Sequence, residues 1–220
     1  MKSVAIKLIT TWPRTIFLLI FLGLTGCALT SQTARLTSYD FGPGPLTTAP
    51  SDRRAPLPAL LLAEVQASPA LGSNAMLYRL LYADAQQLQP YALARWSMPP
   101  ADLLRQRLAD TLGQRRTLLG PDAGTAAGLA TGTASPATLR LTLEEFSQLF
   151  DSPQQSRGLL RLRATLSQGG PGGEQVLAQR SFIVQRPAPS ADAPGGVRAL
   201  RAATEAAAEE LLAWLAQNGQ

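Results

Sequence analysis

Apolar and polar residues alternate over several stretches in the second half of the chain. The stretch 139–144 alternates leucine with charged or hydroxyl side chains, and the same period of two recurs over 160–166; a third strand is predicted over 176–184. This period is typical of strands with one buried face. The glycine-rich run at 169–173 predicts a turn between the last two stretches. Three consecutive strands joined by close turns predict an antiparallel sheet.

The first half of the chain contains shorter apolar stretches. Strands are predicted over 36–41, 60–65 and 76–82, and the third of these is expected to form a hairpin with the second. The stretches between these strands, 42–45, 45–58 and 67–74, are rich in Pro, Gly, Thr or Ala and are expected to be turns or loops. The stretch 120–136, later in the chain, has a similar composition and the same expectation.

Two segments have the periodicity of helices. Leucines spaced by four over 104–112 follow the pair Pro99-Pro100, which is tolerated in a first turn, and Gly113 ends the segment. A second apolar stripe, 197–214, follows a Pro-Gly-Gly break and has spacings of three and four. The order strands, helix, strands, helix predicts an α+β fold, with a mostly antiparallel sheet and two helices packed on one face.

Composition and charge exclude several classes of function. The formal net charge is +5, but three of the 20 basic residues lie in the first 26 positions, so the remainder carries about +2. A field this weak does not favour nucleic acid as a partner. The chain has no histidine and one cysteine, which excludes His-dependent hydrolytic mechanisms and the common His-based zinc sites.

The N-terminus has the layout of a secretory signal. Basic residues come first, an apolar run covers 16–24, and small residues follow. Leu24-Thr25-Gly26-Cys27 matches the lipobox of bacterial lipoproteins, which predicts removal of the signal peptide 1–26 by cleavage between Gly26 and Cys27. The alternative is an uncleaved signal anchor in which Cys27 is an ordinary thiol.

Lipidation of Cys27 would give the protein a membrane anchor without a transmembrane helix. Two or three acyl chains, such as palmitate, anchor a protein stably because each buried methylene contributes about 0.8 kcal/mol. This covalent lipid is the one non-protein group expected, and residues 27–34 form a lipidated tether. Ala28, in place of the Asp that retains enterobacterial lipoproteins at the inner membrane, favours the outer membrane, facing the periplasm.

Several motifs then occur in an order that resembles a known family. They are Tyr39-Asp40-Phe41-Gly42-Pro43, Met76-Leu77-Tyr78-Arg79, Tyr91 with Ala94-Arg95-Trp96-Ser97-Met98-Pro99-Pro100, 145–153 and the Ala-rich terminal helix. With the lipobox, they resemble the ABC-type transport auxiliary lipoproteins, the PqiC-like family. The resemblance covers most of the chain after Cys27 and implies an auxiliary domain over 35–217.

This resemblance implies a non-enzymatic role in transport. Such lipoproteins are accessory components of systems with an ABC permease, an ATPase and an MCE-domain protein, and they support envelope integrity. The implied cargo is phospholipid or another hydrophobic molecule. A structural or assembly lipoprotein of the envelope without a transport role is the alternative. The sequence is also compatible with a homo-oligomer.

One aromatic and proline cluster is the candidate partner-binding site. It comprises Tyr91, Arg95, Trp96, Pro99 and Pro100. Trp, Tyr and Arg are frequent anchors of protein interfaces. The alternative is a structural corner that sets the entry of the helix, with Arg95 stacked on an aromatic ring.

The acidic pair Glu144-Glu145 does not predict a catalytic or metal site. Neighbouring residues on a strand point to opposite faces unless a bulge intervenes, so these carboxylates are expected to be solvent-exposed charges.

Overall fold

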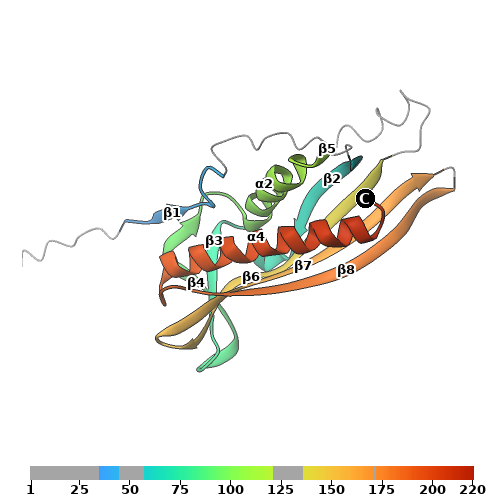
Figure 1. The fold of residues 1–220 in the computed structure, drawn as a ribbon. Coiled ribbons are helices and arrows are strands. Elements are labelled where there is room, and N and C mark those ends of the chain that lie inside the picture. The colour runs from blue at the N-terminus through green and yellow to red at the C-terminus, as the bar shows by residue number, and fades with distance from the viewer. Residues whose placement is uncertain (1–34, 45–56, 121–135, 171) are drawn as a thin grey trace, which may run out of the picture. The chain divides into compact units, whose positions relative to one another are not determined.

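The three strands predicted in the second half of the chain are present as long antiparallel strands. The computed structural model describes residues 35–44, 57–120, 136–170 and 172–220. In it, β6 (Ala137–Ser152) pairs with β7 (Gln155–Gly170), and β7 pairs with β8 (Gly173–Pro187), in each case along most of their length. Figure 1 shows these strands running together beneath the terminal helix.

The other edge of β6 is shared by two strands in succession. β2 (Leu57–Ala67) runs parallel to the first half of β6, and β3 (Ala75–Leu80) runs parallel to its second half. The predicted hairpin between these two strands is therefore wrong. The connection between them contains the short 3-10 helix η1 (Pro69–Leu71), and Ser68 N donates to Leu143 O of β6, so the chain continues along β6 without reversing.

Three further strands complete the sheet of eight. β3 forms its hairpin with β4 (Asp84–Trp96), which sequence periodicity did not predict. β1 (Thr37–Tyr39) is parallel to β4, and β5 (Arg116–Leu119) is parallel to β2. The described strands therefore place β1 and β8 at opposite edges of one mixed sheet whose longest pairings are antiparallel.

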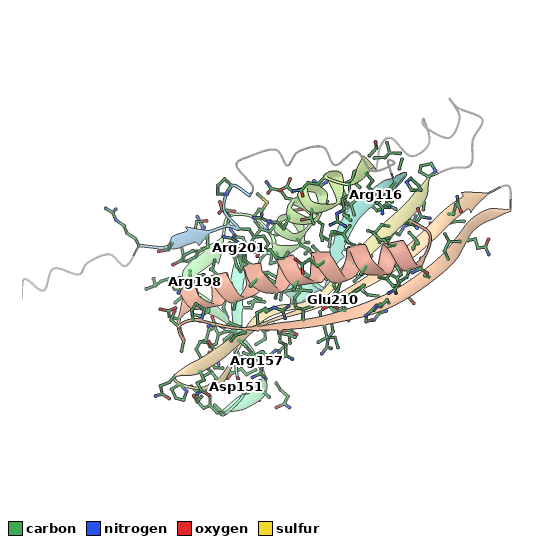
Figure 2. The ribbon with its side chains drawn as sticks, viewed as in Figure 1. Arg116, Asp151, Arg157, Arg198, Arg201 and Glu210 are labelled. Carbon is green, nitrogen blue, oxygen red and sulfur yellow. The ribbon has the colours of Figure 1, made fainter. Side chains whose placement is uncertain are left out.

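Both predicted helices are present. α2 (Pro100–Gly113) matches its predicted bounds, whereas α4 (Ala193–Gln217) begins before the Pro-Gly-Gly break that was expected to precede it. The earlier start has a clear cause, because Asp192 Oδ1 accepts a hydrogen bond from Gly195 N at 2.7 Å and caps the helix. Arg198, Arg201 and Glu210 lie on α4, and Figure 2 labels them.

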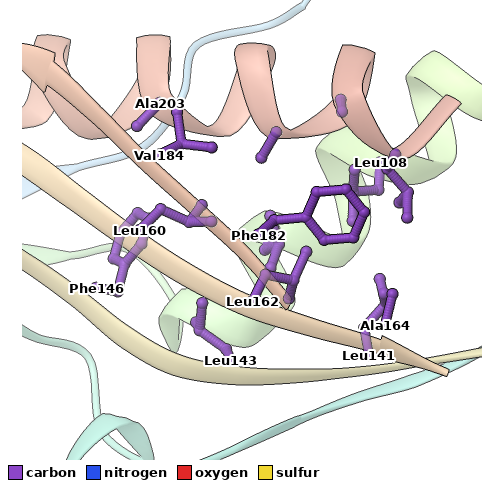
Figure 3. Packing of buried hydrophobic residues seen from close by; sticks show 14 of the residues in the cluster. Leu108, Leu141, Leu143, Phe146, Leu160, Leu162, Ala164, Phe182, Val184 and Ala203 are labelled. Atoms are coloured by element: carbon purple, nitrogen blue, oxygen red, sulfur yellow. The ribbon is translucent and has the colours of Figure 1, made fainter. Parts of the chain in front are cut away.

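The two helices pack on one face of the sheet and share one core. Leu108 of α2, Phe146 of β6 and Phe182 of β8 belong to the same buried cluster (Figure 3). α4 lies very close to β7, since a Cβ on Gly158 would stand 2.8 Å from Leu200 N. The α+β fold with two helices on one face is confirmed.

Some predictions lie outside the described residues. They are the signal peptide 1–26, the tether 27–34 with its cleavage and lipidation positions Gly26 and Cys27, and most of the loops predicted at 45–58 and 120–136. Residues Leu36–Gln220 form one compact unit. Within the described ranges, no helix combines the length and apolar character needed to cross a membrane.

Candidate partner-binding site

Trp96 lies at the centre of a buried aromatic triad. Its ring centroid is 5.7 Å from that of Phe41 and 5.5 Å from that of Phe146, and its side chain is fully buried. Phe41 and Phe146 are themselves in edge contact at 6.2 Å. The three residues come from different motifs noted in the sequence, and they join the chain after β1 to the end of β4 and the middle of β6.

The backbone around this triad forms a corner. Ser97 N donates to Tyr39 O at 2.7 Å, so the chain leaving β4 stays attached to β1. Pro99 then acts as the N-cap of α2, and its carbonyl accepts from Asp102 N and Leu103 N. Pro100, at the first helical position, is buried. The segment from Trp96 to Pro100 thus directs the chain from the sheet into α2.

A cleft of about 370 Å³ lies beside the corner. Buried Arg107 reaches into it from α2 and donates from Nη2 to Phe41 O at 2.7 Å. The lining combines apolar walls with hydrogen-bonding groups, which suits binding better than covalent chemistry. It comprises Asp40, Phe41, Gly42, Pro43, Ser97, Met98, Leu103, Gln106, Arg107 and Asp110.

Tyr91 belongs to a separate polar network below the N-terminus of α4. Its hydroxyl donates to Oε1 of the fully buried Gln148 at 2.8 Å, and Gln148 Nε2 donates to Ser156 Oγ at 2.8 Å. Burial raises the pKa of the Tyr91 hydroxyl, and the nearby Tyr78 and Asp192 raise it further. Tyr91 is therefore a neutral hydrogen-bond donor that fixes the side chain of Gln148.

The two carboxylates of the acidic pair on β6 form ion pairs with different arginines. The register of β6 against β7 shifts between Leu143 and Glu145, so the bulge that the sequence left open is present. Even so, the two carboxylates have different partners. Glu144 pairs with Arg163, whereas Glu145 pairs with Arg79 at 3.2 Å. Within the described part of the chain, no group of three potential ligands is placed to hold a metal ion.

Two more arginines, Arg157 and Arg116, lie elsewhere on the sheet (Figure 2). Arg157 at the start of β7 pairs with Asp151 at the end of β6, beside the hairpin tip. Arg116 of β5 is buried, and its Nε and Nη1 have no hydrogen-bond partner among the described residues. Loss of hydration lowers the pKa of its guanidinium.

The five residues of the predicted site do not share one surface. Trp96 and Pro100 are buried, Tyr91 and Pro99 are half-buried, and Arg95 is exposed. Among the described residues, the cation–π contact joins Arg180 to Phe182, and Arg95 stacks on no ring. Binding of a partner by this cluster stays a prediction.

Sequence reasoning assigned no role to two buried polar residues, Arg107 beside the corner and Gln148 in the network of Tyr91. Gln148 and Arg107 are both buried, at 0% and 8% exposure. The signal for Arg107 was its place beside Leu108 on the apolar side of α2. The signal for Gln148 was its core-facing parity with Phe146 along β6.

Comparison with known proteins identifies the family. The sequence profile described as ABC-type transport auxiliary lipoprotein component matches residues 39–211. The chain belongs to this family. The match includes the corner, the cleft and all strands from β2 to β8, so the auxiliary lipoprotein domain accounts for nearly all of the described structure.

Solved structures support the same fold. A Xanthomonas campestris protein superposes with a TM-score of 0.60 at 19% sequence identity, covering 86% of this chain and 90% of that one. A second, uncharacterized protein gives a TM-score of 0.58 at 16% identity, covering 82% and 99%. No curated protein matches the chain.

Proposed function

We propose that this auxiliary lipoprotein serves a transport system built from an ABC permease, an ATPase and an MCE-domain protein. Its cargo would be phospholipids or other hydrophobic molecules, and its contribution would be to support envelope integrity. Acyl chains on Cys27 would hold it on the periplasmic side of the outer membrane. The alternative is an envelope lipoprotein with a structural or assembly role and no part in transport.

The observation that carries this proposal is the family match over residues 39–211. The lipobox at Leu24–Cys27 agrees with a lipoprotein, and Ala28 favours the outer membrane. The family is described as a transport component. The buried polar side chains of Gln148 and Arg107 make hydrogen bonds within the fold. This agrees with a structural role for them, as expected of a docking component.

Affinity purification of the tagged, full-length protein from its native membranes tests the proposal. We expect an MCE-domain protein, with its permease and ATPase, to be recovered in amounts comparable to the tagged protein. Mass spectrometry of the same sample should find acyl chains on Cys27. A Cys27→Ala variant is the matched control and should no longer fractionate with the outer membrane.

Two outcomes would contradict the proposal. Recovery of acylated protein without any transport component, after chemical crosslinking, would favour the structural or assembly role. An unmodified thiol at Cys27 would overturn the anchoring itself.

A further inference from the structure

Two leucines lie half-exposed where β1 joins β4. Leu36 is 49% exposed and Leu93 is 50% exposed. β1 and β4 pair in parallel through Thr37↔Ala94 and Ser38↔Arg95. Continuing this register by one residue places Leu36 beside Leu93, on the same face as Arg95. Leu36, Leu93 and Arg95 are called the β1–β4 patch below.

A bulge in β4 exposes this patch. The register of β4 against β3 shifts between the pairs Ala75↔Arg95 and Leu77↔Pro90, which leaves extra residues on β4. Within this shifted segment, Ala94 faces the core at 5% exposure, and its neighbour Leu93 faces solvent. Bulges commonly redirect side chains in this way. Leu93 is therefore held outward by the pairing of the sheet.

The patch also carries a free positive charge. Arg95 is exposed and forms no hydrogen bond or ion pair with another described residue. The nearby carboxylate of Asp40 is engaged locally, because its Oδ1 accepts from Gly42 N at 2.7 Å. One arginine near an anionic bilayer strengthens binding by about fivefold, and its long stem can lie along apolar surface.

The short segment between Cys27 and Leu36 limits how far this patch can lie from a lipid anchor. Cys27 precedes Leu36 by nine residues, which span at most about 32 Å when fully extended. If Cys27 carries acyl chains, β1 is the element of the described fold closest along the chain to the bilayer. A tethered surface needs only weak intrinsic affinity, because the tether keeps its local concentration high.

We propose that the β1–β4 patch rests on the anionic phospholipid surface of the membrane that anchors the protein. This inference depends on the lipidation of Cys27 in the proposed function. Leu36 and Leu93 enter the interfacial layer and Arg95 contacts lipid phosphates. β8 then faces away from that surface, since β1 and β8 lie at opposite edges of the sheet.

Site-specific fluorescence in vesicles tests the orientation. Cys27 is the only cysteine of the chain, so once it is acylated an introduced cysteine is the one free thiol. Full-length lipidated protein carrying Leu93→Cys or Leu36→Cys is labelled with a small fluorophore. It is then reconstituted in phosphatidylethanolamine–phosphatidylglycerol vesicles containing brominated lipid. Ile183→Cys is the matched control, because Ile183 is 57% exposed on β8.

We expect brominated lipid to quench the labels at positions 36 and 93 strongly and the label at 183 weakly. Adding Arg95→Gln should reduce quenching at 93 in these anionic vesicles and have no effect in phosphatidylcholine vesicles. Equal quenching at 93 and 183 in acylated protein would overturn the docking proposal alone, since no transport protein is present. An unacylated Cys27 would overturn the anchoring and the docking together.

Discussion

At the scale of single residues, burial separates the candidate site into parts with different roles. Trp96 is enclosed by Phe41 and Phe146, whereas Arg95, its neighbour on β4, is exposed. A fully buried indole cannot contact a partner without opening the corner between β4 and α2. The geometry around Trp96 therefore fits the structural-corner interpretation, and Arg95 is the residue of the cluster that is free to meet another surface.

Replacing Trp96 tests this division. Trp96→Ala should lower the free energy of unfolding by about 3–5 kcal/mol, because it removes the centre of the aromatic triad. Chemical denaturation followed by circular dichroism measures the change. Leu93→Ala, on the exposed side of the same strand, should change it by less than about 0.5 kcal/mol. A Trp96→Ala protein of normal stability that no longer assembles with its partners would instead make Trp96 an interface residue.

The hydroxyl of Tyr91 offers a finer test. Tyr91→Phe should cost about 1–2 kcal/mol, because Oε1 of the fully buried Gln148 loses a donor while the ring packing remains. Tyr82 is 49% exposed, so Tyr82→Phe is the control and should not change the stability. Equal effects of the two substitutions in a thermal melt would show that the Tyr91–Gln148 bond contributes nothing.

At the scale of elements, apolar periodicity predicted the helices and strands whose pattern comes from one buried face. The leucines of α2 and the alternation over 139–144 and 160–166 reflect one buried face each, and α2, β6 and β7 were predicted from them. β4 was not predicted, because polar residues and Pro90 interrupt its pattern. Its bulged pairing with β3 makes burial along it irregular. Strand partners depend on distant segments, which explains why β2 and β3 were paired incorrectly.

The same reasoning applies to the candidate site. The cluster from Tyr91 to Pro100 was recognisable from its residue types, but its division into core and surface depends on Phe41 and Phe146, far away in sequence. The cleft beside Arg107 was not foreseen, because it forms only when the turn after β1 meets α2.

The start of α4 gives a prediction with a defined pH dependence. The Ser190 hydroxyl and the Gly195 N–H hold the pKa of Asp192 below its ordinary value of 3.8. The carboxylate therefore stabilises the fold above that value, and this stabilisation is lost as the pH falls below it. Asp192→Ala should cost about 1 kcal/mol near neutral pH.

The pH dependence separates capping from a general charge effect. The difference in unfolding free energy between the parent protein and Asp192→Ala should shrink in acid and vanish well below pH 3.8. Glu210→Ala, an exposed acid on the same helix, is the control and should show no such trend. A difference that is constant with pH would argue against the cap.

At the scale of the whole molecule, one core joins both helices to the sheet. Leu108 of α2 and Phe182 of β8 belong to the same buried cluster although they come from distant parts of the chain. Elements that share a core are expected to unfold together in a domain of this size. The unit from Leu36 to Gln220 should therefore behave as one cooperative body.

Two core substitutions test this cooperativity. Leu108→Ala should cost about 2–5 kcal/mol and Phe182→Ala about 3–5 kcal/mol. Each should shift a single transition seen alike by circular dichroism and tryptophan fluorescence. Ile183→Ala, facing outward beside Phe182, should leave that transition in place. Separate transitions for the two probes would mean that α2 and β8 belong to independently folding parts.

The position of β6 has a consequence for how such a chain would be made. β2 and β3 both require β6 as their neighbour, yet β6 begins only at Ala137. During synthesis, β2 and β3 would thus lack this strand partner until β6 has emerged. If the chain is exported as its predicted signal peptide implies, late assembly of this kind would keep it unfolded while it passes through the secretion channel.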